Sequence, residues 1–370
     1  MTTDPAACYD TASDPALYAL LFDPITLGSL RLRNRIGMAP MTRRMTPGTV
    51  PGQVQARYYA RRAGVGLIIT EGTHIDDGHS VDKPDTPALF DASHIAGWKL
   101  VTDAVHAAGG ALACQLWHTG RHARDPIAPS PIASAREGAR TPREMTRADM
   151  DDVAQSFAHA ATCAQHAGFD AIELHGAHGY LLESFLSPAT NHRTDDYGGT
   201  LANRMRFPLE VVRTVRTAVG PSYPIIYRFS QWKIEDFGAH TFDAPEELGT
   251  FVTALRDAGV DILHVSTRNA TEPAYPNVHA TRTLAGWSKQ LSNLPTIAVG
   301  RVSVSASMGD AGEVQTTDPA PAAALVRDNE ADLIAIGRSL IANPDWCDLV
   351  RAGKWRELKA YDKGMLEQLD

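Results

Sequence analysis

Eight short apolar runs recur along the chain and are the main feature of its hydrophobic pattern. Each run is hydrophobic at nearly every position instead of alternating with polar residues, which is typical of strands buried on both faces of a parallel sheet. The runs cover residues 35–39, 66–70, 111–117, 170–174, 224–229, 261–265, 295–299 and 332–336. The sequence therefore predicts eight buried strands.

Helical patterns separate these runs. We expect helices over residues 54–63, 93–108, 146–166, 201–219, 243–258, 320–329 and 345–352. Thr146 and Asp149 form an acidic variant of the capping box at the start of the third helix. Asp243 is the expected N-cap of the fifth helix, which has Pro245 and two glutamates in its first turn.

The repeated alternation of strand and helix predicts an α/β fold, and specifically a (β/α)8 TIM barrel. An open doubly wound sheet that binds a dinucleotide should carry GxGxxG after its first strand, and the sequence has no such motif there. We expect residues 1–20 to form an N-terminal lead and residues 21–370 to form a single barrel domain with a C-terminal extension.

The composition is that of a globular enzyme, with 44% hydrophobic and 21% charged residues. The formal net charge of −8 argues against a nucleic-acid surface. The sequence shows neither a secretory signal nor an apolar run long enough to cross a membrane, so we expect a cytoplasmic protein. Four scattered cysteines without CxxC spacing predict neither a disulfide framework nor an iron–sulfur or zinc cluster.

Polar residues gather where the predicted strands end, which is where TIM barrels carry their chemistry. His175 and His178 lie three residues apart after the fourth run, so in a helical turn both imidazoles would face the same way. Two neutral imidazoles directed at one point can hold an oxygen that gains negative charge, and the Tyr180 phenol can donate a proton nearby. A core histidine pair with an interfacial tyrosine is the structural alternative, and an HxxH metal site is a third interpretation.

Two Gly-Arg pairs indicate a phosphate site. Gly300-Arg301 and Gly337-Arg338 follow the seventh and eighth runs, where barrels often bind phosphate through the backbone N–H groups of their loops. Surface arginines after turn glycines are the structural alternative.

Arg228 lies inside the apolar run IIYRFS, where an unpaired charge is costly. It therefore needs an anionic partner. A ligand with delocalised negative charge would serve, and an ion pair with Glu173 or Glu71 is the alternative.

Six segments of the sequence carry a family signature. They read LFDPITLGSLRLRNRIGMAPMTR, YYARRAGVGLIITEGT, QLWHTGR, ELHGAHGYLLESFLSPATNHRTDDYGGTLANR, YRFS and LIAIGRSLIANPDW. Through them the chain resembles the old yellow enzymes, the flavin-dependent ene-reductases, from residue 21 to residue 346. The resemblance implies FMN across the mouth of the barrel and NADPH or NADH as the reductant.

The resemblance also implies which residues contact the cofactor. Thr42 would hydrogen-bond near the flavin O4, Gln115 would bond the pyrimidine edge, and Arg228 would lie beside N1 and O2. Gly72 would leave room for the ring. The full implied set is Pro40, Met41, Thr42, Gly72, Gln115, Arg228, Gly300, Arg301, Gly337 and Arg338.

The implied reaction reduces the activated C=C bond of an α,β-unsaturated carbonyl compound or a nitroalkene. His175 and His178 match the pair that holds the substrate oxygen, while flavin N5 would supply hydride and Tyr180 the proton. Trp117 would line the substrate pocket, with a core tryptophan as the alternative. Segment 303–319 is longer and more irregular than the family usually shows after the seventh strand.

Two other functions stay open. A metal-dependent TIM-barrel hydrolase would use His175 and His178 with His118 and His122, and would need carboxylates at several strand ends. A flavin-binding protein without catalytic activity would bind FMN but would not oxidise NADPH or NADH. The expected partner is a small activated alkene, with no nucleic acid and no membrane, and both a monomer and a homo-oligomer remain open.

Overall fold

The computed structural model describes residues 15–369. Residues 1–14, which make up most of the expected lead, lie outside the described residues, as does Cys8. The remainder of the lead is helical, because α1 (Pro15–Ala19) is followed by a short 3-10 helix at Leu20–Phe22. The division into a lead and a single barrel domain stays a prediction.

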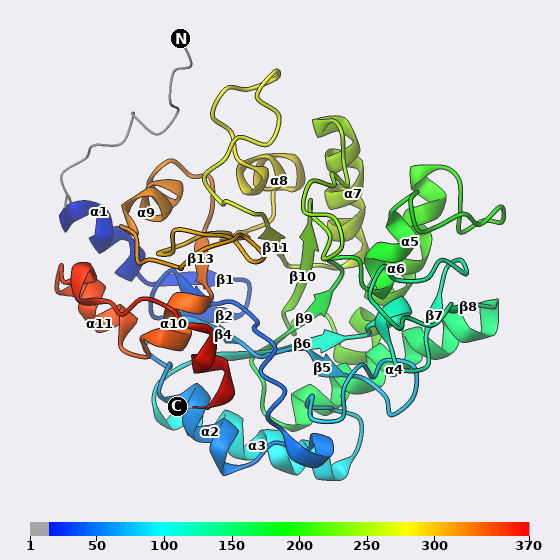
Figure 1. Ribbon diagram of the computed structural model, residues 1–370, viewed down its shortest axis with the longest axis horizontal. Coiled ribbons are helices and arrows are strands. Elements are labelled where there is room, and N and C mark those ends of the chain that lie inside the picture. The colour runs from blue at the N-terminus through cyan, green and yellow to red at the C-terminus, as the bar shows by residue number, and fades with distance from the viewer. Residues whose placement is uncertain (1–14, 370) are drawn as a thin grey trace.

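Eight parallel strands form a closed barrel, so the predicted fold class is confirmed (Figure 1). In chain order they are β3 (Ile36–Met38), β4 (Leu67–Ile69), β6 (Leu112–Trp117), β9 (Ala171–His175), β10 (Ile225–Ser230), β11 (Ile262–Ser266), β12 (Thr296–Val299) and β13 (Leu333–Ile336). Each strand pairs with the next in this order, and β13 pairs with β3, which closes the ring. Every strand lies within one residue of its predicted run.

Helices surround the barrel (Figure 1). The longer ones are α2 (Gln53–Ala60), α3 (Ala92–Ala107), α4 (Arg147–His166), α6 (Leu201–Val219), α7 (Pro245–Ala258), α8 (Leu284–Ser292) and α9 (Ala320–Arg327), and the shorter ones are α5 (Leu181–Leu186), α10 (Arg338–Ala342) and α11 (Trp346–Arg351). All seven predicted helices are present. The sequence patterns did not predict α5, α8 and α10. None of the described helices is long and apolar enough to cross a membrane.

Of the two expected helix N-caps, the one at Thr146 is confirmed and the one at Asp243 is wrong. Thr146 caps α4 as predicted, because its hydroxyl accepts from Asp149 N–H at 3.2 Å while the Asp149 carboxylate accepts from Thr146 N–H at 2.7 Å. The expected N-cap at Asp243 is wrong. Proline favours the first helical position, so α7 begins at Pro245 and its N-cap is Ala244, one residue later than expected.

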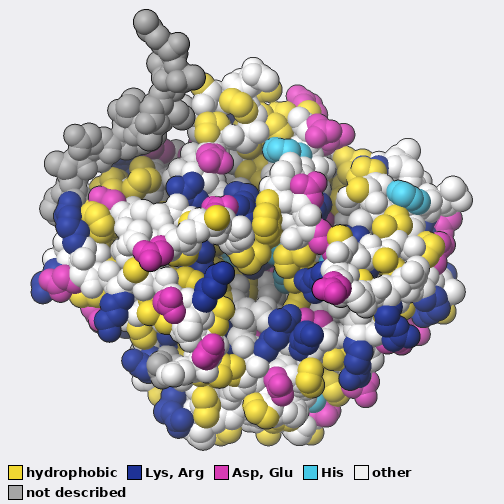
Figure 2. Space-filling view, viewed as in Figure 1, with side chains coloured by type: hydrophobic (Ala, Val, Ile, Leu, Met, Phe, Trp, Pro, Cys, Tyr) yellow, Lys and Arg dark blue, Asp and Glu magenta, His cyan; other side chains and the backbone are white. Residues whose placement is uncertain are grey.

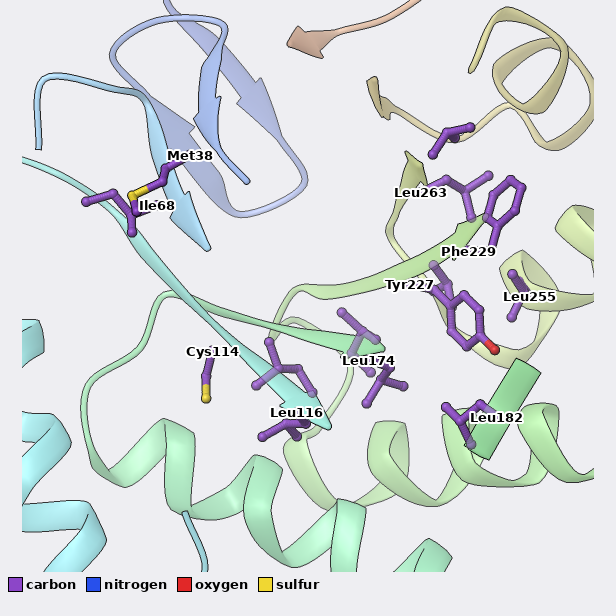
Figure 3. Close-up of a cluster of buried hydrophobic side chains, with 14 of the residues drawn as sticks. Met38, Ile68, Cys114, Leu116, Leu174, Leu182, Tyr227, Phe229, Leu255 and Leu263 are labelled. Carbon is purple, nitrogen blue, oxygen red and sulfur yellow. The ribbon is translucent and has the colours of Figure 1, made fainter. Parts of the chain in front are cut away.

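The strands divide their side chains between two hydrophobic layers, because successive side chains on a strand face opposite sides. In β6, Cys114 and Leu116 join the large core between strands and helices, part of which is drawn in Figure 3. Ala113, between Leu112 and Cys114, belongs instead to a second cluster with Leu67 and Ile226. This second cluster fills the interior of the barrel.

A β-hairpin closes one end of the barrel interior. It consists of β1 (Ile25–Leu27) and β2 (Leu30–Leu32), which pair antiparallel. Leu27, Leu30 and Leu32 belong to the interior cluster, together with residues from the first halves of the long strands such as Ala171 and Ile262. The hairpin therefore covers the amino-terminal end, and the carboxyl end is left for the polar residues.

Segment 303–319 contains no regular helix or strand before α9, in agreement with its irregular sequence. Isolated bridges join Val304 to Thr316 and Val314 to Tyr361. The segment is therefore held against the C-terminal part of the chain.

Candidate active site

Inward-facing positions at the carboxyl ends of four adjacent strands are polar or aromatic. They are Gln115 and Trp117 on β6, Glu173 and His175 on β9, Arg228 on β10, and His264 and Ser266 on β11. The two members of each pair are two residues apart, so both face the interior. Arg228 lies opposite both His175 and His264 in the strand register, which places these three residues side by side. Figure 2 shows a hollow near the middle of one face of the molecule, with basic side chains around it.

His175, His178 and Tyr180 come together, but not through the helical turn that their spacing suggested. His175 is the last residue of β9, His178 has a left-handed φ of 64°, and Tyr180 is the N-cap of α5. The expected helical turn is therefore wrong. The loop nevertheless places the rings in contact, with 5.1 Å between the centroids of the two imidazoles and 5.0 Å between those of His175 and Tyr180.

Both imidazoles are neutral. Burial, followed by the positive charge of Arg228, lowers the pKa of His175 and that of His178 well below the ordinary value. Nδ1 of His175 accepts from the Ala177 N–H at 3.3 Å, and Nε2 of His178 lies 2.9 Å from Ser266 Oγ. Within residues 15–369, the other nitrogen of each ring has no hydrogen-bond partner, so both are available to a ligand.

Aromatic rings enclose the two histidines. The Trp117 indole stacks on His175 at 6.2 Å between centroids and meets Tyr180 edge-on at 4.9 Å. Trp232, in the loop after β10, lies against His178 at 4.2 Å. A Cβ added at Gly72 would lie 2.4 Å from the Trp117 ring, so the room that this glycine leaves is taken by the indole.

Tyr180 is a protonated phenol in this environment, because burial raises its pKa. Arg136, which lies in the loop after β6, acts in the opposite direction, chiefly through its positive charge. His122 meets the Tyr180 ring edge-on at 5.4 Å. The phenol thus has a cation beside it that would stabilise a phenolate.

Arg228 is surrounded by a buried network but has no ion pair within residues 15–369. Glu173 accepts from Gln115 at 2.7 Å and from His264 Nδ1 at 2.5 Å. Burial pushes the pKa of Glu173 up, but the attraction of His264 and the hydrogen bonds outweigh it and the pKa is lowered. Nε of Arg228 is buried without a hydrogen-bond partner. The alternative ion pair with Glu173 is therefore not formed, because Glu173 acts on Arg228 only through its charge. Glu71, the other alternative partner, is engaged elsewhere.

Glu71 holds the segment that follows β3. Its carboxylate accepts the backbone N–H groups of Arg43 at 2.8 Å and Arg44 at 3.0 Å. This fixes the chain just after Pro40, Met41 and Thr42. Pro40 and Met41 are half-buried and Thr42 is exposed.

The ends of β3 and β13 are close together. A Cβ added at Gly337 would lie 3.6 Å from the Met41 sulfur. The two sequence-predicted groups of cofactor contacts, one after the first strand and one after the last, therefore meet at one edge of the mouth.

The two Gly-Arg pairs differ in their surroundings. A Cβ at Gly300 would lie 2.6 Å from the Thr267 carbonyl oxygen, so only glycine fits this close approach. Arg301 is exposed, whereas Arg338 donates to the carbonyl oxygens of Ala306 and Ser307 in segment 303–319. The segment thus determines the direction of the Arg338 guanidinium. The hydroxyls of two buried serines near these pairs, Ser303 and Ser339, have no hydrogen-bond partner.

The hydrolase interpretation is not supported. Within the described part of the chain, no group of three or more His, Cys, Asp or Glu side chains could hold a metal ion. His118 and His122 are buried, and burial lowers the pKa of each to about 4. The three described cysteines, Cys114, Cys163 and Cys347, are free and buried.

Sequence reasoning considered Glu173 only as an alternative partner of Arg228, and it gave no role to four other residues that the fold brings to the site. The full set is Glu173, His264, Ser266, Trp232 and Arg136. The first three could have been found, because each lies two residues from another polar inward position at a strand end. Trp232 and Arg136 lie in loops, whose positions no sequence periodicity predicts.

Comparison with known proteins identifies the family. A family model described as the NADH:flavin oxidoreductase / NADH oxidase family matches residues 20–357. The chain is 35% identical to an NADH oxidase of Thermoanaerobacter brockii over 92% of its length, but it spans only 52% of that relative. It is 34% identical to 12-oxophytodienoate reductase 7 of Oryza sativa subsp. japonica, and the match covers 90% of the chain and 88% of the relative.

Solved structures agree with these matches. The structure of morphinone reductase in complex with tetrahydroNAD superposes with a TM-score of 0.79 at 34% identity, covering 94% of this chain and 93% of that one. Because the chain spans about half the length of the NADH oxidase, the activity of that whole protein is not carried over to it.

Proposed function

The chain belongs to the NADH:flavin oxidoreductase / NADH oxidase family, and from this premise we propose that it reduces the activated C=C bond of α,β-unsaturated carbonyl compounds or nitroalkenes. The membership of the old yellow enzyme family that the sequence motifs indicated is thereby confirmed. The proposal depends mainly on one observation, the convergence of two neutral imidazoles and a protonated phenol around Trp117.

FMN is the cofactor of this family, and the residues present fit it. The buried Arg228 Nε lacks a partner, and an anionic ring edge would supply one. Gln115 and Thr42 would offer polar groups to the same ring, and Pro40 and Met41 would lie beside it. Gly72 would act indirectly, because it leaves room for the Trp117 indole. FMN supplies a hydride when it is reduced by NADH or NADPH.

The phosphate of FMN would be held at the ends of β12 and β13. Gly300, Arg301 and Gly337 would contribute backbone N–H groups and positive charge. Arg338 can keep its bonds to Ala306 and Ser307 and still donate to a phosphate, because a guanidinium carries five N–H donors.

His175 and His178 would bind the carbonyl or nitro oxygen of the substrate. Each ring has one nitrogen without a partner in the described chain, and two N–H donors at that oxygen would stabilise the charge that develops there. Removal of one such donor typically lowers the rate by about 10² to 10³.

Tyr180 would donate the proton to the α-carbon of the substrate. A phenol is protonated at neutral pH, burial raises the pKa of Tyr180 further, and Arg136 would stabilise the phenolate that remains. Trp117 contacts both His175 and Tyr180, so it would fix their separation and exclude water from the space between them.

The first test is the visible spectrum of the purified protein, followed by anaerobic titration with NADPH or NADH. We expect a yellow protein whose flavin absorbance is bleached by the nicotinamide and returns when cyclohexenone or a nitroalkene is added. A protein that binds FMN but is not reduced would be the non-catalytic flavoprotein. A protein that remains colourless after incubation with FMN would contradict the proposal.

A further inference from the structure

Ser266 touches the site from β11, at the carboxyl end of the strand. It is buried, and its hydroxyl lies 2.9 Å from Nε2 of His178. Within the described residues this nitrogen is the only hydrogen-bond partner of the hydroxyl. The contact joins a residue with no assigned role to one of the two imidazoles that would bind the substrate oxygen.

Several contacts position His178. Its backbone N–H donates to Ser230 Oγ at 2.9 Å and its carbonyl accepts from Ile234 N–H at 3.2 Å, which fixes the left-handed conformation of the residue. Trp232 lies against one face of the ring, with 31° between the planes. In this arrangement Nε2 is the ring nitrogen that faces Ser266.

A neutral imidazole carries its proton on one nitrogen only, so Nε2 is either the donor to Ser266 or the acceptor from it. If Nε2 donated, the buried hydroxyl proton of Ser266 would have no acceptor in the described chain, and leaving a buried donor unsatisfied is unfavourable. If the hydroxyl donates, both groups are satisfied. The proton of His178 then resides on Nδ1, the nitrogen without a protein partner.

We propose that Ser266 is a positioning residue that fixes His178 as the Nδ1-protonated tautomer, so that an N–H and not a lone pair is offered to the substrate oxygen. This inference rests on the proposed function of His178. His175 is the opposite tautomer, because its Nδ1 accepts a hydrogen bond from the Ala177 N–H and its proton therefore resides on Nε2. Opposite tautomers thus present two donors from two rings.

The test is ¹⁵N NMR of the holoenzyme with labelled histidine, in which the two nitrogens of a neutral imidazole give separate signals for each tautomer. The His178 signals are assigned by their loss in His178→Asn. We expect protonated Nδ1 in the wild type, and a shift of the proton toward Nε2 in Ser266→Ala. Ser266→Thr keeps the hydroxyl and should keep the wild-type tautomer.

Wild-type His178 with its proton on Nε2 would overturn the inference, whether or not the Ser266 variants fold. An unchanged tautomer in Ser266→Ala would overturn it as well. The matched control is Ser288→Ala on α8, a buried serine whose hydroxyl donates to the Leu284 carbonyl within the same helix and does not contact His178. It should leave the His178 signals unchanged.

Binding of 4-chlorophenol to the oxidised holoenzyme gives a second measurement. We expect its Kd to rise about tenfold in Ser266→Ala, because a hydrogen-bond donor is no longer held in place, and to stay the same in Ser288→Ala. An unchanged Kd in Ser266→Ala would contradict the inference while leaving the proposed function intact. If wild-type protein fails to reduce enones, the proposed function fails, and the tautomer measurement still decides whether Ser266 fixes His178.

Discussion

At the scale of single residues, the site depends on keeping two histidines uncharged in a buried place next to a cation. Arg228 lies beside His175 in the strand register and lowers the pKa of His175 and of His178. Neutral rings donate hydrogen bonds without adding a charge, so they stabilise a developing oxyanion and do not bind every anion tightly. The same residues would be ordinary core histidines if each had both nitrogens bonded.

Tyr180→Phe separates the two halves of the proposed reaction. We expect reduction of the flavin by NADPH or NADH to be unchanged, because the hydride transfer to FMN needs no phenol. Oxidation by cyclohexenone should slow by about 10² to 10⁴, the usual contribution of a positioned general acid. Stopped-flow measurement of each half-reaction checks this.

The matched control is Tyr223→Phe. Tyr223 is a partly buried tyrosine, but its hydroxyl donates to the Phe169 carbonyl oxygen at 2.8 Å and has no part in the proposed site. Both half-reactions should proceed at the wild-type rate in this variant. Equal turnover of cyclohexenone in Tyr180→Phe would remove Tyr180 from the mechanism.

Replacing both His175 and His178 with alanine should weaken the binding of phenol-type ligands to the oxidised enzyme. Both donors to the ligand oxygen are then lost, so the long-wavelength charge-transfer band should appear only at much higher ligand concentration. A spectroscopic titration with 4-chlorophenol measures the effect. His106→Ala serves as the control, because His106 is exposed at the end of α3 and its ring contacts Asp170 at 2.9 Å. An unaltered titration in the double variant would count against the assigned role.

At the scale of elements, buried side chains near the strand ends hold the loops at the carboxyl end of the barrel in place through hydrogen bonds to the neighbouring segment. Glu71 follows β4 and holds the chain after β3 through two backbone N–H groups. Glu183 on α5 does the same for the loop after β9, because its carboxylate accepts from Gly179 N–H at 2.5 Å and binds Lys233 of the next loop. These buried carboxylates place the segments that carry the site.

Glu71 also gives a pH dependence of stability. Burial raises its pKa from 4.5 to about 7, so between these values the folded protein holds a proton that the unfolded chain releases. Glu71 therefore favours the folded state less as the pH rises from about 4.5 to about 7, by up to roughly 3 kcal/mol.

Glu71→Gln removes this titration and keeps an oxygen that can accept both N–H groups. We compare the free energy of unfolding of the wild type with that of the variant. The difference, wild type minus variant, should be smaller at pH 8 than at pH 5. Urea denaturation at both pH values measures the difference. A difference that is independent of pH would show that Glu71 has an ordinary pKa.

At the scale of the whole molecule, the barrel is stabilised by two hydrophobic layers, one inside the ring of strands and one between strands and helices. Closure requires every strand to contribute, because β13 pairs with β3 and β4 pairs with β6. The hairpin β1–β2 fills the amino-terminal end. Polar residues can then gather at the other end without exposing the core.

Leu67→Ala tests the inner layer. Leu67 is fully buried on β4, and its truncation should lower the free energy of unfolding by about 2 to 5 kcal/mol. Leu100→Ala on α3 is the matched control, because its side chain is 44% exposed, and it should change stability by about 0.5 kcal/mol or less. Urea denaturation measures both, and equal effects would contradict the assignment of Leu67 to the interior.

The sequence by itself determined the fold class. All-apolar runs with helical patterns between them can be buried only in a parallel sheet covered by helices, and eight of them close a barrel. The motifs around His175, His178 and Tyr180 also predicted the family and the residues of the candidate site. These features follow from local patterns, so no tertiary contact was needed to find them.

Tertiary structure alone decided how those residues meet. The spacing of His175 and His178 suggested a helical turn, yet a strand end and a left-handed loop bring the rings together. The direction of Arg338, the indole that fills the room beside Gly72, and the contact of Ser266 with His178 all join segments that are far apart in the sequence. Sequence periodicity reports which face of an element a residue occupies, whereas the partner across that face is fixed only when the strands and loops pack.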